Sequence, residues 1–465
     1  MLELKGKKVL VVGLGKSGLA AALFLRHKGA QVTVSDVRSA ESLAKEIPAL
    51  LDEGIMVEAG GHGLLTFRRQ DLIVVSPGVP LSTPELVQAR SFGRPVIGEL
   101  ELAARFLKGQ ILAITGSNGK TTTTAIAGEI LKEGGLPTLV GGNIGVPVVS
   151  LIEESTDDTW SVLEVSSFQL ESTEEFRPKI AVILNITPDH LDLHGSFEAY
   201  ARAKERIFAA QSADDFVVLN ADNTRASEAA ARSKAKVYWF SIEQPVRQGA
   251  WVADGYVVYR SAPGAEIERV MPHAKIPLKG EHNVENVLAA VTASRLAGVG
   301  VDAIARAVEK FQAVEHRLEY VATVHGVEYF NDSKATNVDA TAKAVAAFSN
   351  GIHLILGGKD KGSDYTTLSQ LLRDRVRAIY TIGTAAEKIE SQLRGVVSIH
   401  SCGTLDVAVA RATEAAHPGE VILLAPACSS FDQFENYEHR GRAFKGLVLQ
   451  HLGHGTPTAD AGRNI

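Results

Sequence analysis

The stretch ILAITGSNGKTTTTAIAGEIL at residues 111–131 decides how this chain folds. It opens as an apolar run with strand character, passes through the loop TGSNGKTT at 115–122, and continues as an amphipathic helical pattern. A strand, a glycine-containing loop and a helix in this order are typical of α/β proteins that bind phosphate through backbone N–H groups. Ile114 occupies the position of the first glycine in the common G-x-x-x-x-G-K-[ST] pattern, so the loop is a shorter variant.

The residue types in this loop indicate a nucleoside triphosphate. Lys120 would neutralise charge on the β- and γ-phosphates, and a threonine hydroxyl would reach Mg²⁺. A threonine-rich helix N-cap without a ligand is the alternative interpretation. The predicted ATP-binding loop residues are Gly116, Ser117, Asn118, Gly119, Lys120, Thr121 and Thr122.

The same alternation of strand, loop and helix continues on both sides of residues 111–131. Strand-like runs alternate with helical patterns, the first of which covers 17–27. The runs are KKVLVVG, QVTVSD, DLIVVSPG, WSVLEVSS, IAVILNIT, DFVVLNAD, VEYFNDS, IHLILGG, RAIYTIG and EVILLAP. We expect an α/β protein of three domains: a Rossmann-like N-terminal domain at 1–98, a central P-loop ATPase-like domain with a parallel sheet at 99–313, and a C-terminal Rossmann-like α/β domain at 314–452. Segment 453–465, rich in small and polar residues, is predicted to be a flexible tail.

Composition and charge favour a cytoplasmic enzyme that acts on small molecules. The 465 residues, 45% of them hydrophobic and 22% charged, are too many for one ordinary core. The sequence has no run of about 18 uncharged apolar residues, so we expect no membrane span, and no secretory segment is expected near Met1. Two cysteines are too few for a disulfide framework, and the net charge of -6 argues against a nucleic-acid partner. We expect a monomer in the reducing cytoplasm.

A second glycine-rich loop, GLGKSG at 13–18, follows the first strand and opens a helix, with Asp36 about twenty residues on. In form this is a dinucleotide fingerprint, and it would suit the pyrophosphate of NAD or of a UDP-sugar. A tight turn without a ligand is the third possibility.

Three polar residues follow the loop at 115–122 along the chain. Glu164 ends a strand in LEVSSFQLE, His190 lies in the strand exit NITPDHLD, and Lys204 lies on the next helix. Because the ends of adjacent parallel strands converge, Glu164 and His190 can complete the coordination of a metal beside the loop. Considered separately, Glu164 would be interpreted as a solvated residue that caps a strand, and His190 as an ordinary loop histidine.

At these residues the chain resembles the Mur ligase family, the ATP-dependent amino-acid ligases of peptidoglycan synthesis, over nearly all of 1–452. The motifs that carry the resemblance are TGSNGKTT, GGNIG at 141–145, LEVSSFQLE, NITPDHLD, YARAKERIF at 200–208, GEHNVEN at 280–286, EHRLE at 315–319 and NDSKATN at 331–337. Together with ACSSFDQFENYEHRG at 427–441, the last motif is similar to the D-glutamate-adding members.

The resemblance implies a reaction and its metal ligands. ATP would phosphorylate the carboxylate of UDP-N-acetylmuramoyl-L-alanine, and the amino group of D-glutamate would attack the acyl phosphate. The implied catalytic residues are Lys120, Glu164, His190 and Lys204. Of two implied Mg²⁺ ions, Thr121 and Glu164 would serve the first, and His190 with a carbamylated Lys204 the second. An ordinary surface lysine is the alternative for Lys204.

The resemblance also implies where each substrate binds. The nucleotide clamp would be Asn283, Asn286, Arg317, Asp332 and Lys334, completed when the domains close, although a structural ion pair is the alternative for Arg317 and Asp332. The acceptor residues would be Lys361, Ser430 and Tyr437, and Lys359 could exchange roles with Lys361. The UDP-substrate residues would be Gly15, Lys16, Ser17, Asp36, Arg38, Ser76, Asn143 and His190. The side chain that contacts uracil is left open.

Two other functions compete with the ligase. The loop at 13–18 with Asp36 also suits an NAD-dependent oxidoreductase, which leaves Lys120 and NDSKATN unexplained. A nucleotide-gated binding module without catalysis is the other, and turnover would eliminate it.

Overall fold

The computed structural model describes residues 2–143 and 145–453. Contacts divide the chain into two compact units. The first consists of Met1–Pro277 and Val284–Phe311, and the second of Leu278–Asn283 and Gln312–Ile465. The predicted tail at 453–465 lies outside the described residues except for Gly453, the last residue of its helix.

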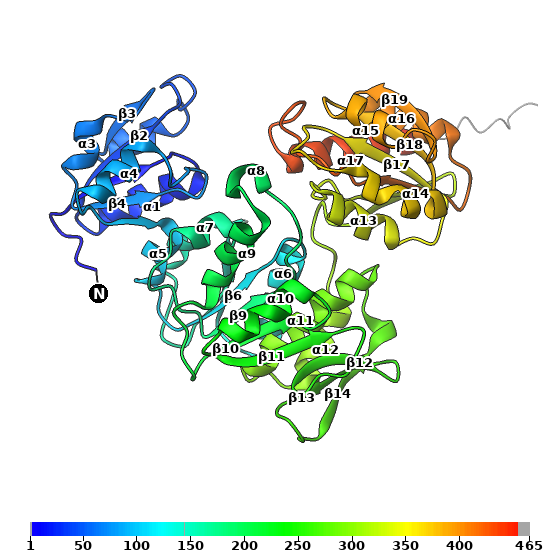
Figure 1. The fold of residues 1–465 in the computed structure, drawn as a ribbon, viewed down its shortest axis with the longest axis horizontal. Coiled ribbons are helices and arrows are strands. Elements are labelled where there is room, and N and C mark those ends of the chain that lie inside the picture. The colour runs from blue at the N-terminus through cyan, green and yellow to red at the C-terminus, as the bar shows by residue number, and fades with distance from the viewer. Residues whose placement is uncertain (1, 144, 454–465) are drawn as a thin grey trace, which may run out of the picture. The chain divides into compact units, whose positions relative to one another are not determined.

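The N-terminal part of the first unit is a five-stranded parallel sheet in the order β3-β2-β1-β4-β5 (Figure 1). Its strands are β1 (Lys8–Val12), β2 (Gln31–Asp36), β3 (Met56–Ala59), β4 (Leu72–Val75) and β5 (Val96–Gly98). Its helices are α1 (Lys16–His27), α2 (Ile47–Asp52), α3 (Leu64–Arg68) and α4 (Pro84–Ser91). Strands β1 and β4 are β-branched runs buried on both faces, as a parallel sheet between helices requires, whereas the edge strand β3 is partly exposed.

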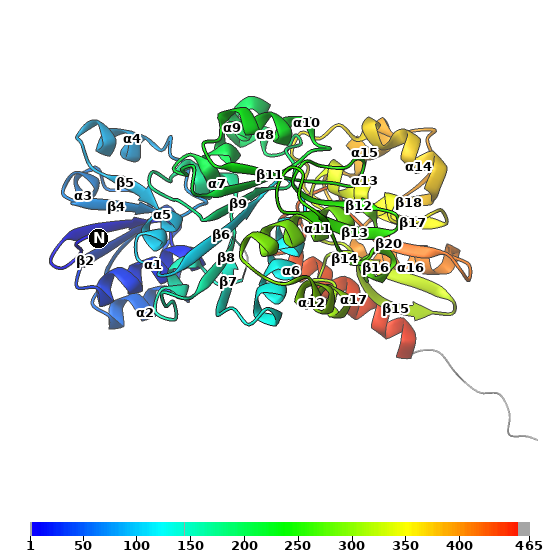
Figure 2. The same ribbon diagram turned by 90° about the horizontal axis from the view of Figure 1, so that it is seen from below.

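The rest of the first unit surrounds a nine-stranded sheet in the order β14-β13-β12-β11-β10-β9-β6-β8-β7. Its strands are β6 (Gln110–Thr115), β7 (Thr138–Gly142), β8 (Trp160–Glu164), β9 (Ile180–Ile183), β10 (Phe216–Asn220), β11 (Lys236–Ser241), β12 (Gly249–Ala253), β13 (Tyr256–Arg260) and β14 (Ile267–Pro272). Its helices are α5 (Glu99–Ala104), α6 (Lys120–Glu133), α7 (Ser167–Glu171), α8 (Leu191–His194), α9 (Phe197–Glu205), α10 (Thr224–Ser227), α11 (Glu281–Leu296) and α12 (Val301–Lys310), with short 3-10 turns that include η1 (Val148–Leu151). Helix α6 packs on β7 and β8 and beside α12 (Figure 2).

The second unit contains a six-stranded sheet in the order β15-β16-β20-β17-β18-β19, parallel except for β15. Its strands are β15 (Glu319–Val324), β16 (Val327–Asn331), β17 (Ile352–Gly357), β18 (Val376–Ile382), β19 (Ser398–Gly403) and β20 (Val421–Leu424). Its helices are α13 (Val338–Ala346), α14 (Ser369–Arg375), α15 (Ala386–Gln392), α16 (Leu405–Ala415) and α17 (Tyr437–Gly453). All ten predicted strand runs form strands, and the predicted α/β class is confirmed.

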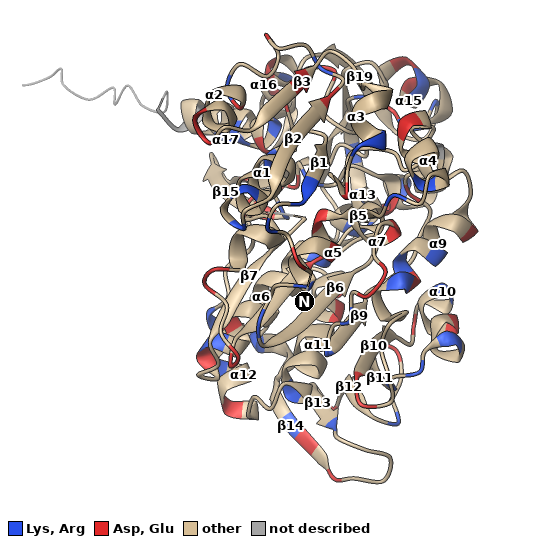
Figure 3. Cartoon of the chain, turned by 90° about the vertical axis from the view of Figure 1, so that its left-hand side faces the viewer, with Lys and Arg blue, Asp and Glu red and all other residues tan. Residues whose placement is uncertain are grey.

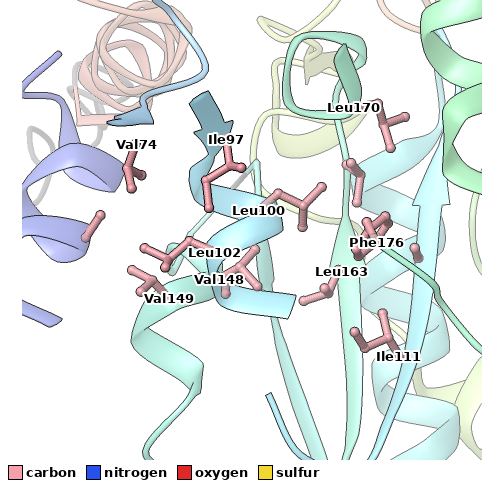
Figure 4. Packing of buried hydrophobic residues seen from close by; sticks show 14 of the residues in the cluster. Val74, Ile97, Leu100, Leu102, Ile111, Val148, Val149, Leu163, Leu170 and Phe176 are labelled. Atoms are coloured by element: carbon pink, nitrogen blue, oxygen red, sulfur yellow. The ribbon is translucent and has the colours of Figure 1, made fainter. Parts of the chain in front are cut away.

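Helix α5 carries the chain from the first sheet to the second. Its Leu100 and Leu102 are at most 1% exposed and share a hydrophobic cluster with Val148 and Val149 of η1 (Figure 4). This apolar packing joins the two sheets of the first unit into one body.

Two buried carboxylates reinforce the same junction. Glu101 accepts the N–H groups of Glu174 at 2.8 Å and Phe176 at 3.0 Å. Glu99, which is 1% exposed, accepts the N–H of Val149 at 2.8 Å. Burial raises the pKa of Glu99 to about 7, although the hydrogen bond from Val149 opposes the rise.

Basic and acidic residues are interspersed along the chain (Figure 3). Within the described residues, the helices are too short or too polar for any of them to cross a membrane.

Candidate active site

The loop between β6 and α6 is held in shape by the exit of β9. The backbone carbonyl of Asn185 accepts the N–H of Ser117 at 2.9 Å, and its side-chain oxygen accepts the N–H of Asn118 at 2.9 Å. Gly119 has a φ of 87°, and a Cβ there would collide with the side chain of Asn286. Only glycine therefore fits at 119, and Asn185 fixes the rest of the loop.

Two lysine side chains converge on this loop. Both Lys120 Nζ, at 2.9 Å, and Lys204 Nζ, at 2.8 Å, donate to the carbonyl of Gly116. Lys204 is 2% exposed, and its ammonium lies 4.5 Å from the ring centre of Tyr200. Burial, and then the charge of Lys120, lower the pKa of Lys204 well below its ordinary value. The neutral amine, the form that can react with CO₂, is thereby favoured at Lys204.

Glu164 lies at the end of β8 with one oxygen unsatisfied. Its Oε1 accepts the side-chain amide of Asn143 at 3.0 Å. Its Oε2 is buried and has no hydrogen-bond partner among the described residues. A buried carboxylate oxygen without a partner is costly unless a cation satisfies it, so Glu164 fits the requirement for a Mg²⁺ ligand.

His190 precedes α8 in a left-handed conformation, with a φ of 53°. Its ring meets that of Phe168 edge-on at 5.2 Å, and Phe168 stacks on His194 at 4.8 Å. His194 in turn meets the ring of Tyr200 at 5.2 Å. This series of rings connects His190 to Tyr200, whose ring lies under the ammonium of Lys204. The structure therefore places Lys120 and Lys204 on one carbonyl of the loop and Glu164 at the end of the adjacent strand β8, and a series of ring contacts leads from Tyr200 to His190.

A cavity of about 830 Å³ opens at the carboxyl ends of the strands of the five-stranded sheet. Every predicted UDP-substrate residue except His190 lines it: Gly15, Lys16, Ser17, Asp36, Arg38, Ser76 and Asn143. Asn143 also bonds to Glu164, so the cavity adjoins the metal-binding candidates.

Within this cavity the polar groups already bind one another. Both oxygens of Asp36 are engaged: Oδ2 accepts the N–H of Leu14 at 2.7 Å and Nη2 of Arg38 at 2.8 Å, and Oδ1 accepts the backbone N–H of Arg38 at 2.8 Å and its Nε at 3.1 Å. Burial raises the pKa of Asp36, but the hydrogen bonds from Arg38 and Leu14 outweigh it and lower the pKa to about 2. Ser76 is similarly occupied, because its hydroxyl donates to the carbonyl of Gly13 at 2.7 Å. Asp36 thus supports the loop at 13–18 rather than presenting a free carboxylate to a ribose.

The predicted clamp residues are distributed over the two units. Asn286 belongs to the first unit, where its Oδ1 accepts the hydroxyl of Thr123 at 3.2 Å. Asn283, Arg317, Asp332 and Lys334 belong to the second. There Arg317 lies 4.0 Å from Asp332, whose pKa burial raises to about 6.

The predicted acceptor residues lie on loops that follow β17 and β20 and at the start of α17. Lys359 and Ser429 exchange backbone hydrogen bonds of 2.8 and 3.2 Å, so the first two loops are tied together. Asp360 accepts the N–H groups of Gly362 and Ser363 at 3.1 Å and thereby fixes the turn that holds Lys361. Ser430 is 2% exposed.

Two further residues complete this acceptor region. The ring of Tyr437 lies 5.2 Å from the ammonium of Lys334. Burial raises the pKa of the Cys428 thiol to about 11, so that this cysteine is a packing residue and not a nucleophile.

Comparison with known proteins identifies the family to which the chain belongs. Three family models match it: the Mur ligase MurD-like N-terminal domain at 7–98, the Mur ligase middle domain at 114–294, and the Mur ligase glutamate ligase domain at 316–428. A protein of Acidobacterium capsulatum named UDP-N-acetylmuramoylalanine--D-glutamate ligase is 68% identical over 452 residues, which are 97% of this chain and 98% of that one. The chain belongs to the Mur ligase family.

A further relative and two solved structures are also similar to this chain. The protein of the same name from Koribacter versatilis is 60% identical over 96% of this chain and 98% of its own. Two solved structures share the fold: a MurF ligase from Thermotoga maritima in complex with ADP (TM-score 0.60, 15% identity, 97% and 96% covered) and a pseudomurein peptide ligase type C from Methanothermus fervidus (TM-score 0.59, 21% identity, 96% and 100% covered).

Family membership settles the class of chemistry. As a Mur ligase, the chain is an ATP-dependent ligase that forms an amide bond, and Mg²⁺ accompanies ATP in this family. The NAD-dependent oxidoreductase and the non-catalytic module are therefore wrong, in agreement with the engaged carboxylate of Asp36.

Two residues of this Mur ligase site were not assigned from the sequence. Asn185 holds the loop, and Tyr200 lies under Lys204 while its hydroxyl meets that of Ser117 at 3.0 Å. Tyr200 is four residues before Lys204 on α9, a spacing that places both on one helix face and that could have indicated the contact.

Proposed function

We propose that this Mur ligase joins D-glutamate to UDP-N-acetylmuramoyl-L-alanine through an acyl phosphate, in cytoplasmic peptidoglycan precursor synthesis. Relatives at 68% and 60% identity carry the name of that activity. The observation that carries the mechanism is the convergence of Lys120 and Lys204 on the carbonyl of Gly116, beside the unsatisfied Oε2 of Glu164. Such a site offers a lysine cation at Lys120 and a ligand for a divalent cation at Glu164, as a bound triphosphate requires.

The phosphate end acts by positioning and charge neutralisation. Lys120 moves from the Gly116 carbonyl to the β- and γ-phosphates. Because Asn185 engages the N–H groups of Ser117 and Asn118, the N–H groups of 119–122 are the ones that hold the phosphate oxygens. Two Mg²⁺ ions, one held by Thr121 and Glu164 and the other by His190 and Lys204, would supply further neutralisation when bound. Asn283, Asn286, Arg317, Asp332 and Lys334 hold the adenine and ribose of ATP.

We assign a carbamate to Lys204. The neutral amine attacks CO₂, a C–N bond forms, and one proton leaves to solvent, so that the neutral amine becomes an anionic oxygen ligand. Burial and the nearby charge of Lys120 support this assignment because both favour the neutral amine.

The three substrates are assigned to the three domains. The domain at 1–98 binds the UDP portion in the cavity lined by Gly15, Lys16, Ser17, Asp36, Arg38, Ser76 and Asn143. His190 reaches the other end of that substrate. The domain at 99–313 binds ATP, and the domain at 314–452 binds D-glutamate through Lys361, Ser430 and Tyr437. The protein works as a monomer without a nucleic-acid partner.

An amino-acid panel tests this proposal. Phosphate release is measured with ATP, Mg²⁺ and UDP-N-acetylmuramoyl-L-alanine, and with D-glutamate, L-alanine, L-lysine or diaminopimelate as acceptor. Among the four acceptors, only D-glutamate is expected to support phosphate release. Equal turnover with any other acceptor would refute the assignment within the family, and no release with D-glutamate would refute the reaction.

A further inference from the structure

Arg440, on α17, is a fully buried cation in the second unit. It is 0% exposed, and its guanidinium donates to four oxygens. Nε meets the hydroxyl of Ser333 at 3.0 Å, and Nη2 meets the carbonyls of Ser333 at 2.8 Å and Cys428 at 3.1 Å. Nη1 meets the carbonyl of Ser429 at 3.4 Å.

These contacts tie together the loops that follow two neighbouring parallel strands, and the guanidinium also lies close to the loop that follows a third. Ser333 follows β16, whereas Cys428 and Ser429 follow β20. Gly358 follows β17, and a Cβ on it would lie 3.1 Å from Nη1 of Arg440 and would also strike the carbonyl of Ser429. A single guanidinium therefore holds together the loops that carry Lys334 and Ser430, and it packs closely against Gly358 in the loop that carries Lys361.

The charge of Arg440 is not balanced by a hydrogen-bonded carboxylate among the described residues. Asp432 is the carboxylate whose charge acts on it, but the Oδ2 of Asp432 accepts the N–H of Thr384 at 2.9 Å. Burial lowers the pKa of Arg440 to about 10, so the group is still charged at neutral pH. A buried cation without a paired anion is costly, and a neutral side chain would hold the loops at a lower cost.

The peptide between Ser429 and Ser430 shows on which side a counter-charge would lie. Its oxygen accepts the N–H of Lys359 at 2.8 Å and Nη1 of Arg440 at 3.4 Å, and in a trans peptide the N–H points the opposite way. The N–H of Ser430 is therefore directed away from the guanidinium. An anion beside Ser430 would meet the positive end of this peptide dipole, with the charge of Arg440 behind it.

We propose that Arg440 is a positioning residue for the acceptor amino acid: it fixes the turn at Ser430 and supplies the positive charge that a carboxylate of the acceptor balances. The inference rests on the proposed D-glutamate ligase function. It assigns to α17 a part in choosing a dicarboxylate acceptor.

The test compares two substitutions of Arg440 with a control on the same helix. Arg440→Met removes the charge at similar length, Arg440→Lys keeps it with fewer donors, and Arg442→Met changes an exposed arginine two residues on. Thermal unfolding of each variant is recorded first. If Arg440→Met does not fold, Arg440→Lys carries the test.

Steady-state kinetics then distinguish a positioning role of Arg440 from a purely structural role. Arg440→Lys should raise the KM for D-glutamate about tenfold and leave the KM for ATP within about twofold. Arg440→Met should raise the KM for D-glutamate further, and it should reduce by at least about tenfold the preference for D-glutamate over D-glutamine and D-isoglutamine, each of which lacks one carboxylate. Arg442→Met should match the wild type.

The inference is overturned if the KM values for ATP and D-glutamate rise equally, if only kcat falls, or if the preference over the amides is unchanged. Wild-type turnover is the reference that separates the two proposals. A wild type inactive with D-glutamate refutes the proposed function, whereas an active wild type with unaffected Arg440 variants refutes this inference alone.

Discussion

The first unit contains two glycine-rich loops that look alike in sequence and differ in their electrostatics. Both follow a central parallel strand and open a helix, one at 13–18 and the other at 116–119. Around the first, Asp36, Arg38 and Leu14 satisfy one another's hydrogen bonds. Around the second, two lysine side-chain amines donate to one carbonyl, and a buried carboxylate oxygen has no hydrogen-bond partner among the described residues.

The difference shows what each loop contributes before any ligand arrives. The first loop is complete and shapes a cavity by its backbone, so its ligand adds contacts without replacing any. The second holds two lysine amines and a buried carboxylate oxygen whose partners change when phosphate and metal arrive, which is the arrangement expected where charge is neutralised during a reaction. Four experiments test this distinction, in order of decreasing effect.

Replacing the lysine of each loop should separate catalysis from binding. Lys120→Ala should reduce kcat by at least about 1,000-fold, because a cation that acts on transferring phosphate is lost. Lys16→Ala should instead raise the KM for the UDP substrate about tenfold and keep kcat. Phosphate release measures both, and equal losses of kcat would contradict the distinction.

Lys204→Ala should cost about 100-fold in activity, since a ligand of the second metal is lost. Added formate or acetate should restore part of the rate by replacing the carbamate oxygens. Lys132→Ala is the matched control, because Lys132 is exposed and pairs with Glu129 on the surface of α6. Full activity of Lys204→Ala would show that the carbamate is wrong.

The glycines of the two loops should differ in their tolerance of alanine. Gly119→Ala places a methyl group against Asn286 at a φ of 87° and should destabilise the protein by about 1–3 kcal/mol. Gly15→Ala meets nothing within 4 Å and should change stability by less than about 1 kcal/mol. Thermal unfolding compares the two, and equal shifts would count against the steric account.

Asp36→Asn should have the smallest effect, on stability. The folded pKa of Asp36, about 2, lies below its ordinary value of 3.8, so its contribution is full above about pH 4 and is lost as the pH falls through 2. We expect a loss of about 1 kcal/mol at pH 7, because Arg38 is half exposed. Urea unfolding at pH 7 and pH 3 should show the two proteins converging at the lower pH.

Much of this fold could be read from local patterns. The β-branched runs predicted the central parallel strands, since burial on both faces leaves nearly continuous apolar segments. The parallel edge strands β3, β7 and β19 were not predicted, because they are only partly buried. The antiparallel additions were not predicted, although Asp254 and Gly255 join β12 to β13 with φ values of 49° and 75°. An Asp-Gly pair between alternating apolar residues is a strong hairpin signal.

The candidate site was predictable to the extent that its residues lie in motifs. The residues at the ends of β6 and β8 were found because parallel strands bring their carboxyl ends together. The engagement of Asp36 by Arg38 could not be foreseen, because spacing does not say whether a carboxylate faces a ligand or its own loop. The burial of Arg440 could not be predicted from the sequence for a related reason: it depends on loops near residues 333, 358 and 428 that are far from one another along the chain.

Glu99, buried where the two sheets of the first unit join, affects how pH profiles of this enzyme are read. Its folded pKa of about 7 exceeds the ordinary 4.5, so the native state takes up a proton there and stability declines as the pH rises from about 4.5 to 7. The sign is opposite to that of Asp36. A break near pH 7 in an inactivation or rate curve would therefore report a carboxyl group that touches no substrate, and Glu99→Gln is the control that removes it before the break is attributed to catalysis.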